Sequence, residues 1–275
     1  PAYCIFEVTR GSAKQLKQLL GQARSVCWAR ERREKLESEG RGSEFREAVC
    51  PHCQATIDLT GYDASPEVHC EFCHTTWPAD PTDQSQTKAM KPYRLCDECG
   101  MYSKPRRFTI FYFYFLLVVY GFSSRPTWRC PACMRGEAWK MLFGNLLFVI
   151  GVPVAIVQLV RAYGGTDVGG PLPGLDAANL KARNQRLEHA IADYHKILEA
   201  QPVSSGVKYN IGLAFLHNED LEGAAKMLEY SLKDCDNFAP AAVALAGCYE
   251  RLDNPTQLSE LKRKWNAEES PEPGE

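Results

Sequence analysis

The sequence predicts a multi-domain, α-rich protein in which small β metal-binding modules and a transmembrane helix precede a C-terminal all-α helical repeat. Three observations predict this class. Eight of the twelve cysteines form four C-x2-C pairs, one twenty-residue segment carries no charge, and small and aromatic residues recur every 34 positions near the C-terminus. A chain of 275 residues has room for two or three such modules.

Composition limits the function classes before any motif is considered. The formal net charge is −2, so the chain as a whole lacks the basic character of a nucleic-acid-binding protein. Cysteines at metal-ligand spacing must stay reduced to bind an ion, which favours a cytosolic location for the metal modules. The cysteines outside the four pairs are expected to be small buried thiols: Cys4, Cys27, Cys235 and Cys248.

Residues 1–48 are expected to form an N-terminal strand followed by an amphipathic helix. The opening PAYCIFEV resembles a first strand. Ser12 then begins a helical pattern that runs to Glu39, with apolar residues at helical spacing as far as Cys27 and mostly charged residues beyond it. Because the apolar stripe fades, we expect a helix packed on its neighbours rather than a long coiled coil.

Residues 49–78 carry the first set of metal-ligand spacings. Two C-x2-C pairs are separated by sixteen residues, which suits a short β-hairpin that brings two tight turns to one ion. Four thiolates close a tetrahedron and leave no position for a reacting water, so a structural site is expected.

The segment from Val49 to Trp77 resembles the short zinc ribbon that often starts bacterial membrane-bound regulators and repeat proteins. It has a CPxC pair, a Gly-containing hairpin and an aromatic residue after the last pair. This resemblance implies a binding or structural role and carries over no catalytic residue. Four cysteines make His52, His69 and His74 unnecessary as ligands, and iron in a rubredoxin-like site would use the same four sulfurs.

A polar, Pro-bounded linker at 79–92 leads to a second module at 93–137, where two more C-x2-C pairs occur. We expect zinc rather than iron in both modules. The expected ligands of the two structural sites are Cys50, Cys53, Cys70, Cys73, Cys96, Cys99, Cys130 and Cys133.

An apolar insertion at 108–122 separates the two pairs of the second module. As a helix it reaches only about 22 Å, which is short for a bilayer. Its aromatic alternation also suits a strand, although no turn residue occurs between Phe108 and Tyr120. Three arrangements remain: a membrane-surface flap beside one shared ion, a helical hairpin with 141–160 that separates the pairs, and an ordinary buried part of the module. Basic residues on both flanks favour the flap.

Residues 138–162 are the expected transmembrane helix. From Met141 to Val160 twenty uncharged residues span about 30 Å, the thickness of a hydrocarbon core. Aromatic and basic residues at both ends suit the two membrane interfaces. The expected membrane-contact residues of the insertion and of this helix are Phe111, Phe113, Phe115, Trp139, Phe148 and Ile156.

A Gly/Pro-rich linker at 163–176 leads to a helical repeat at 177–266, and a tail at 267–275 is expected to be disordered. Ala190 and Ala224 lie 34 residues apart, and the segments around them resemble the tetratricopeptide repeat (TPR) family. That resemblance implies stacked helix pairs whose concave side holds a peptide or another protein. The residues expected to contact a partner there are Tyr209, Asn210 and Phe215.

No phosphate loop, HExxH or GxSxG motif occurs, so no enzyme is expected. The expected function is a membrane-anchored scaffold or assembly adaptor that docks partner proteins at a membrane complex, in contact with lipid and without a small-molecule substrate. Two alternatives stay open: an Fe(Cys)4 electron-transfer subunit, and a zinc-ribbon regulator that binds nucleic acid. The expected location is a membrane, through one span or a two-helix hairpin, with the ribbons on the cytosolic side.

Overall fold

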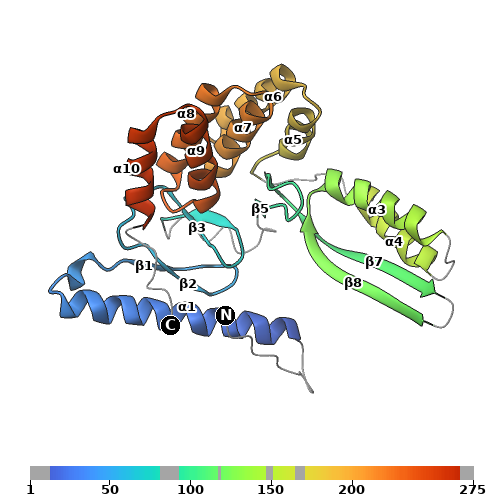
Figure 1. Ribbon diagram of the computed structural model, residues 1–275, viewed down its shortest axis with the longest axis horizontal. Coiled ribbons are helices and arrows are strands. Elements are labelled where there is room, and N and C mark those ends of the chain that lie inside the picture. The colour runs from blue at the N-terminus through green and yellow to red at the C-terminus, as the bar shows by residue number, and fades with distance from the viewer. Residues whose placement is uncertain (1–12, 81–92, 117–118, 147–150, 165–170, 267–275) are drawn as a thin grey trace.

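A computed structural model describes residues 13–80, 93–116, 119–146, 151–164 and 171–266. The C-terminal helices form an array, two small β modules lie along one side of it, and a long N-terminal helix runs beneath them (Figure 1). A β-hairpin carrying two helices projects to one side. The expected N-terminal strand, Cys4 and the expected disordered tail lie outside the described residues.

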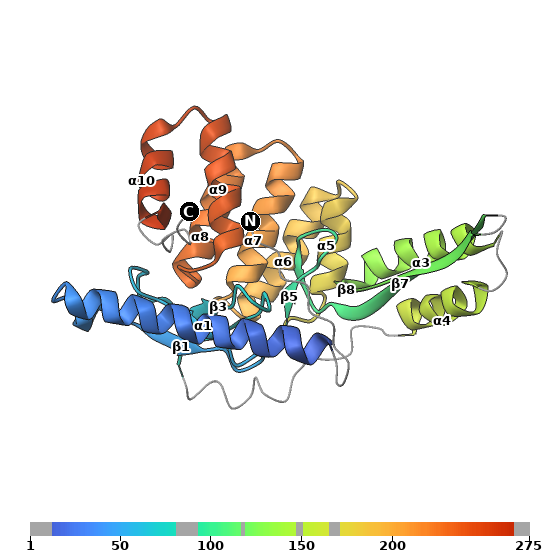
Figure 2. The ribbon, with the colours of Figure 1, turned by 60° about the horizontal axis from the view of Figure 1, so that its bottom comes forward.

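The N-terminal helix α1, Ala13–Ser38, packs one face on the first metal module, and its length is visible in Figure 2. Gln22 donates a hydrogen bond to the carbonyl of Cys53, and the Ser25 hydroxyl accepts one from the amide of Thr56. Ala29 is buried on the same face. Cys27 lies on the opposite side and is exposed, so the expectation of a buried thiol is wrong there, while Cys235 and Cys248 are buried.

The first metal module, ribbon 1, consists of a short 3-10 helix and two antiparallel hairpins. The 3-10 helix η1 is Gly42–Glu44. Strands β1 (Glu47–Val49) and β2 (Thr56–Asp58) form one hairpin, and β3 (Glu67–His69) and β4 (Thr76–Pro78) form the other. Trp77, the aromatic residue after the last cysteine, is buried between the hairpins and fills the module's small core.

The second metal module, ribbon 2, begins with a short hairpin and then extends into a long one. Strands β5 (Arg94–Leu95) and β6 (Tyr102–Ser103) pair first. Strands β7 (Arg106–Leu116) and β8 (Val119–Arg129) then pair in register over their whole length.

Most of the apolar insertion therefore forms strand β7 and the start of β8, in an antiparallel hairpin. The aromatic and β-branched residues of the insertion favour strands. The lack of turn residues between Phe108 and Tyr120 argues against a hairpin. The long run of strand pairing stabilises the hairpin despite that lack. The connection between the two strands, at 117–118, lies outside the described residues.

The predicted transmembrane helix at 138–162 is wrong. Most of its described residues fall in two helices, α3 (Pro131–Asn145) and α4 (Val152–Tyr163), which pack on each other and on β7. Among the residues that the structure describes, no helix combines the length and apolarity needed to cross a membrane, which also overturns the predicted membrane-spanning location. The wing, as we name β7, β8, α3 and α4 together, is the projecting part in Figure 1.

Local chemistry explains why the apolar run divides into two helices. Asn145 is fully buried and donates to the carbonyls of Met141 and Phe111. Gly151 packs so closely on the Asn145 side chain that a Cβ there would overlap it. Pro153 then occupies the first turn of α4, a position that proline favours because its missing N–H is not needed.

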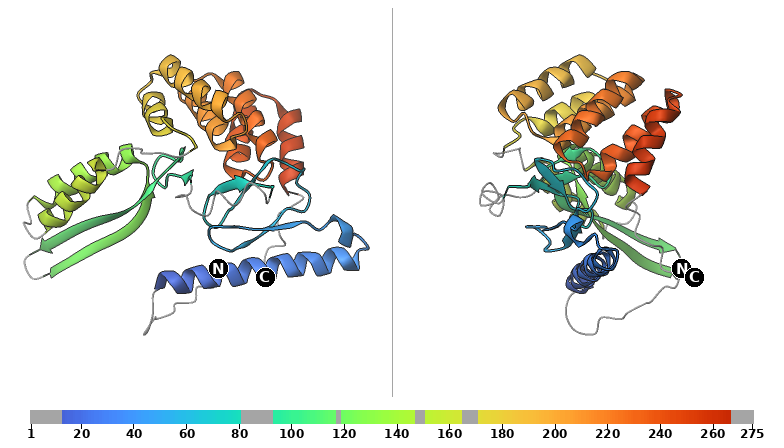
Figure 3. Two further views of the ribbon diagram at one scale, coloured as in Figure 1. Left: turned by 180° about the vertical axis from the view of Figure 1, so that it is seen from behind. Right: turned by 90° about the vertical axis from the view of Figure 1, so that its left-hand side faces the viewer.

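Six further helices form three helical pairs, seen from behind in Figure 3. Helices α6, α8 and α10 begin at Leu187, Leu221 and Pro255, which are 34 residues apart each time. At Gly212 a Cβ would lie 2.8 Å from the Leu228 side chain, so glycine permits the close approach of two helices that the repeat pattern predicted. The six bounds are α5 (Leu175–Arg183), α6 (Leu187–Ala200), α7 (Ser205–His217), α8 (Leu221–Asp234), α9 (Ala239–Arg251) and α10 (Pro255–Asn266).

Candidate metal centres and their contacts with the helical repeat

Each C-x2-C pair forms the same tight turn. The amide four residues after the first cysteine donates to that cysteine's carbonyl in all four pairs. In three pairs the residue after the second cysteine is left-handed: Gln54, His74 and Gly100. In the fourth pair the chain continues from Cys130 directly into α3 instead. The turns aim both sulfurs of a pair to one side, as a shared ion requires.

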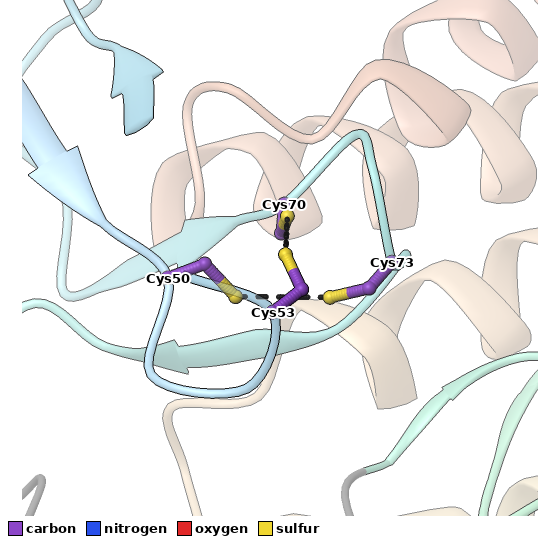
Figure 4. Close-up of side chains that lie close together, drawn as sticks. All are labelled: Cys50, Cys53, Cys70 and Cys73. Carbon is purple, nitrogen blue, oxygen red and sulfur yellow. Dashed lines mark hydrogen bonds between the residues drawn. The ribbon is translucent and has the colours of Figure 1, made fainter. Parts of the chain in front are cut away.

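The four sulfurs of ribbon 1 come from its two hairpins and face one another in Figure 4. The Cys50–Cys73 sulfur distance is 3.7 Å and the Cys53–Cys70 distance is 3.5 Å. Four Zn–S bonds of about 2.3 Å in a tetrahedron place the sulfurs about 3.8 Å apart. The donor set therefore fits a tetrahedral ion of this size.

Ribbon 2 brings its four sulfurs together although thirty residues separate the two pairs. Cys96, Cys99, Cys130 and Cys133 lie within 4.8 Å of one another, and the Cys99–Cys130 sulfur distance is 3.9 Å. The β7–β8 hairpin makes this possible, because its register returns the chain beside its own start. A helical hairpin that separates the two pairs across a membrane is excluded by this clustering.

Clustering the thiols changes their acidity before any ion is considered. Hydrogen bonds from Cys53, Cys70 and Cys73 hold the pKa of Cys50 far below its usual range. The three cysteines of the other cluster do the same for Cys96. Hydrogen bonds to Cys50 raise the pKa of Cys53 and Cys70, and burial adds to the effect, so a divalent cation is the natural replacement for their protons.

Positive charge lies beside both clusters. Arg183, on α5 of the repeat, donates from Nη1 to the Cys133 sulfur at 3.1 Å. Arg94, between the two ribbons, is close enough to Cys73 and Cys96 for their charges to raise its pKa, although burial lowers it overall. Each divalent ion with four thiolates carries net charge −2, so the two guanidinium groups offset part of the charge of the two sites.

The three histidines near the first cluster lie outside its sulfur group. His69 is buried against Phe238 of the repeat, with the two rings in an edge-to-face contact. Burial lowers the pKa of His69 to about 3, and the charge of His74 adds to this effect. His69 is therefore a neutral packing residue at physiological pH.

The two ribbons contact each other directly. Thr75 of ribbon 1 pairs with Arg94 of ribbon 2 in an isolated β-bridge. Thr76 and the Tyr102 hydroxyl share a hydrogen bond of 2.5 Å. The Thr75 hydroxyl also lies 3.0 Å from the Cys73 sulfur, so the contact between ribbons reaches the metal ligands.

Asn210 on α7 holds ribbon 2 by its main chain. Its side-chain oxygen accepts from the Tyr102 amide at 2.8 Å, and its Nδ2 donates to the Tyr102 carbonyl at 2.7 Å. Asn179 on α5 donates to the same carbonyl and is held in turn by the Tyr194 hydroxyl. Gly206 leaves room for the Tyr102 ring, because any Cβ there would overlap it.

Asn237, just before α9, holds ribbon 1 in the same way. Its side-chain oxygen accepts from the His69 amide at 2.9 Å, and its Nδ2 donates to the His69 carbonyl at 2.8 Å. Glu67 adds a second contact, since one carboxylate oxygen accepts from both the amide and the hydroxyl of Ser205. Each ribbon is thus held by a two-bond asparagine contact, which we call an asparagine clamp.

The residues expected to contact a partner through the repeat are occupied within the chain. Asn210 binds Tyr102, as described above, and Tyr209 packs edge-to-face on Phe238. Phe215 is partly buried against the core of the repeat. The inner surface that the TPR resemblance assigns to an external peptide instead contacts the chain's own metal modules.

The expected membrane-contact residues lie in the wing. Trp139 and Ile156 are exposed on α3 and α4, whereas Phe111 is partly buried against those helices. The side chains of Phe113 and Phe115, and all of Phe148, lie outside the described residues.

Sequence reasoning missed the residues that connect the ribbons to the repeat: Asn179, Asn237, Arg183, Glu67 and Ser205. Asparagines on mostly apolar inner helices were the available signal, because a buried amide needs hydrogen-bond partners. Their partners are main-chain groups far along the chain, which no spacing rule identifies.

No described protein family matches this sequence, and no curated protein matches it. Two solved structures of MamA are similar in part. A point mutant of MamA shares 16% identity and a TM-score of 0.31, over 50% of this chain and 96% of that chain. A MamA AMB-1 structure shares 15% identity and a TM-score of 0.31, over 52% of this chain and 75% of that chain.

Proposed function

We propose that this protein is a non-catalytic, metal-organised scaffold. Its helical repeat holds two zinc ribbons in one fixed arrangement, and partner proteins dock on the surfaces that the assembly leaves exposed. The two asparagine clamps carry this proposal, because they use the repeat's inner face to bind main-chain groups of the chain's own ribbons.

Zinc is the proposed ion. The sulfur separations suit a tetrahedral ion, and four thiolate ligands without an open position are typical of structural zinc. Cys50, Cys53, Cys70 and Cys73 would hold one ion and Cys96, Cys99, Cys130 and Cys133 the other. The ion's contribution is structural: in ribbon 1 and at the start of ribbon 2 it holds turns whose flanking strands are only two or three residues long.

Helix α1 supports the docking part of the proposal. This helix exposes Leu19, Leu20 and Val26, although it is otherwise rich in charge. Isolated exposed apolar residues are common on protein surfaces, but neighbouring ones on one helix are typical of protein contacts. We propose that a partner protein binds here, since the inner face of the repeat is already in contact with the ribbons.

Metal analysis of the purified full chain tests the metal-dependent part. Two zinc ions per chain are expected, with no absorbance in the visible range. Iron with visible absorbance would overturn the proposal in favour of the Fe(Cys)4 electron-transfer alternative. Binding of a nucleic acid that tracks zinc content would favour the regulator alternative instead.

Hydrogen exchange on the same preparation tests the clamp. The amides of Tyr102 and His69 are expected to exchange slowly with zinc bound and much faster after chelation. Unchanged exchange after complete zinc removal would mean that the ions do not organise the assembly.

Cross-linking in the native cell tests docking. Leu20→Glu is expected to remove cross-links that the wild type forms. The matched control is Val243→Glu, which alters an exposed valine on α9 and is expected to leave them unchanged.

A further inference from the structure

The wing exposes a continuous apolar surface that the scaffold proposal does not use. Trp139 and Phe143 on α3 and Leu146 at its C-cap share one face at helical spacing, with Phe143 65% and Leu146 62% exposed. On α4, Val157 and Val160 are 56% and 65% exposed. Side chains this apolar lie mostly in water here, whereas the opposite helix faces pack on each other and on β7.

The two exposed faces join along one side of the wing. The indole nitrogen of Trp139 on α3 donates to the Tyr163 hydroxyl on α4 at 3.1 Å. The Arg135 guanidinium lies over the Tyr163 ring at 5.0 Å. The Trp139 and Phe143 rings stack at 5.8 Å between centroids. We call these exposed apolar side chains of the two helices the patch, and the Trp139–Tyr163 contact connects its two parts.

The patch changes in character along the wing. Phe143 and Leu146 lie toward the end of α3 that is far from ribbon 2, and Trp139 and Tyr163 lie nearer the base. From Trp139 to Leu146 is seven residues, or about 10 Å of helix. Lys140 and Arg161, both exposed, are within two residues of Trp139 and Tyr163 along the chain. An apolar end, then a Trp–Tyr pair, then basic residues is the order of a membrane interface.

The segment that contains the wing is strongly basic, unlike the chain as a whole. Residues 104–164 contain eight Lys or Arg and a single acidic residue, Glu137. Glu137 is buried and paired with Arg129, so it adds no negative surface. The segment thus has a formal charge of +7, in a chain whose net charge is −2.

We propose that the wing binds an anionic lipid surface, with its apolar end in the headgroup and upper acyl region of one leaflet and its basic residues at the phosphates. The apolar end extends about 10 Å along α3, which is comparable to the depth of about 5–10 Å to which interfacial helices bury apolar side chains. The wing enters one leaflet and crosses no bilayer.

Charge also argues against the competing occupants. A second copy docked wing to wing would bring two strongly basic surfaces together, which is unfavourable. Nucleic acid would satisfy the positive charge but would leave Phe143, Leu146 and Val157 in water. An anionic leaflet accommodates both properties of the patch.

Vesicle co-sedimentation of the zinc-loaded full chain tests the proposal. We expect the protein to sediment with vesicles of phosphatidylcholine mixed with phosphatidylglycerol, to bind pure phosphatidylcholine far less, and to be released by salt. Binding that is equal on both vesicle types would overturn the electrostatic part. No binding to either type would overturn the whole proposal.

Variants assign the binding to the patch. Phe143→Ser with Val157→Ser is expected to abolish sedimentation, and Val243→Ser, which alters a more exposed valine on α9, is the control. Lys140→Gln with Arg161→Gln is expected to weaken partition about 30-fold at low salt. Zinc content and circular dichroism check that each variant is folded.

Depth is measured through Trp139. Lipids brominated near the headgroup are expected to quench the fluorescence of Trp139. The Trp139→Phe variant identifies that contribution, because it lacks this indole. The lipid proposal is wrong if the Phe143→Ser, Val157→Ser variant binds vesicles as strongly as the wild type does. It is also wrong if sedimentation equilibrium shows that the wild type is a dimer, the variant a monomer, and vesicle binding the same in both.

Discussion

The two metal modules bring their four cysteine sulfurs together in different ways. Ribbon 1 gathers its four cysteines within 24 residues and is complete by itself. Ribbon 2 needs the long β7–β8 hairpin to join its halves and receives a hydrogen bond to a ligand sulfur from the repeat, through Arg183. A self-contained module uses the repeat only for placement, whereas a divided one also uses it to support the metal site. The difference shows that a helical repeat can donate a hydrogen bond to a metal ligand as well as hold a metal module in place.

Loss of one ligand from each module tests this comparison with the largest effect. Cys70→Ser and Cys130→Ser should each leave one zinc per chain, and structural zinc contributes on the order of 10 kcal/mol to folding. We expect Cys130→Ser to destabilise the wing as well, because the β7–β8 hairpin begins and ends at the metal site of ribbon 2. Metal analysis with hydrogen exchange across β7 and β8 measures both. Equal wing exchange in the two variants would remove the distinction between the modules.

The two asparagine clamps differ in how many side-chain hydrogen bonds the ribbon main chain keeps after the asparagine is replaced. Asn237→Ala removes a side-chain partner of both the His69 amide and the His69 carbonyl, so we expect a loss of about 3 kcal/mol in the free energy of unfolding. Asn210→Ala should cost about 2 kcal/mol, because Asn179 still donates to the Tyr102 carbonyl. Urea unfolding measures both.

The control for the clamps is Asn218→Ala, which removes one hydrogen bond within a helix end and should cost well under either value. If Asn210→Ala proved the costlier clamp variant, the shared carbonyl would not explain the difference.

Acid should weaken the ribbon 1 contact through His69. Its pKa is about 3 in the folded protein, because burial disfavours the charged ring, and about 6.5 when unfolded. Between these values the unfolded chain binds a proton that the folded protein does not, so stability is full above pH 6.5 and falls as the pH drops toward 3.

At pH 5 this contribution amounts to a loss of about 2 kcal/mol relative to pH 7. Urea unfolding with excess zinc, comparing the wild type with His69→Phe at several pH values, isolates it. The variant should show the shallower decline, and parallel curves would exclude His69 as the cause.

The smallest expected effect concerns Arg183. Arg183→Gln should lower the zinc affinity of ribbon 2 about tenfold and leave ribbon 1 unchanged, because only the Cys133 sulfur loses a donor. Arg183→Lys should restore part of the affinity through its remaining charge. Competition with a chromogenic chelator separates the two sites when Cys70→Ser serves as the background. A uniform loss at both sites would point to general destabilisation instead.

Local patterns in the sequence were sufficient for several parts of this protein. Two residues between cysteines already impose a tight turn, and a 34-residue period already implies stacked helix pairs, because each depends on contacts close along the chain. The helix at 13–38, the two sulfur clusters and the spacing of α6, α8 and α10 follow from such patterns.

Only the tertiary structure decided the wing and the clamps. The apolar runs at 108–122 and 141–160 have the composition of membrane segments, but long-range strand pairing and the buried Asn145 corner turn them into a hairpin carrying two helices. The asparagine clamps join residues 108 and 168 positions apart. Contacts between distant residues depend on the free energy of the whole assembled fold, which no local spacing contains.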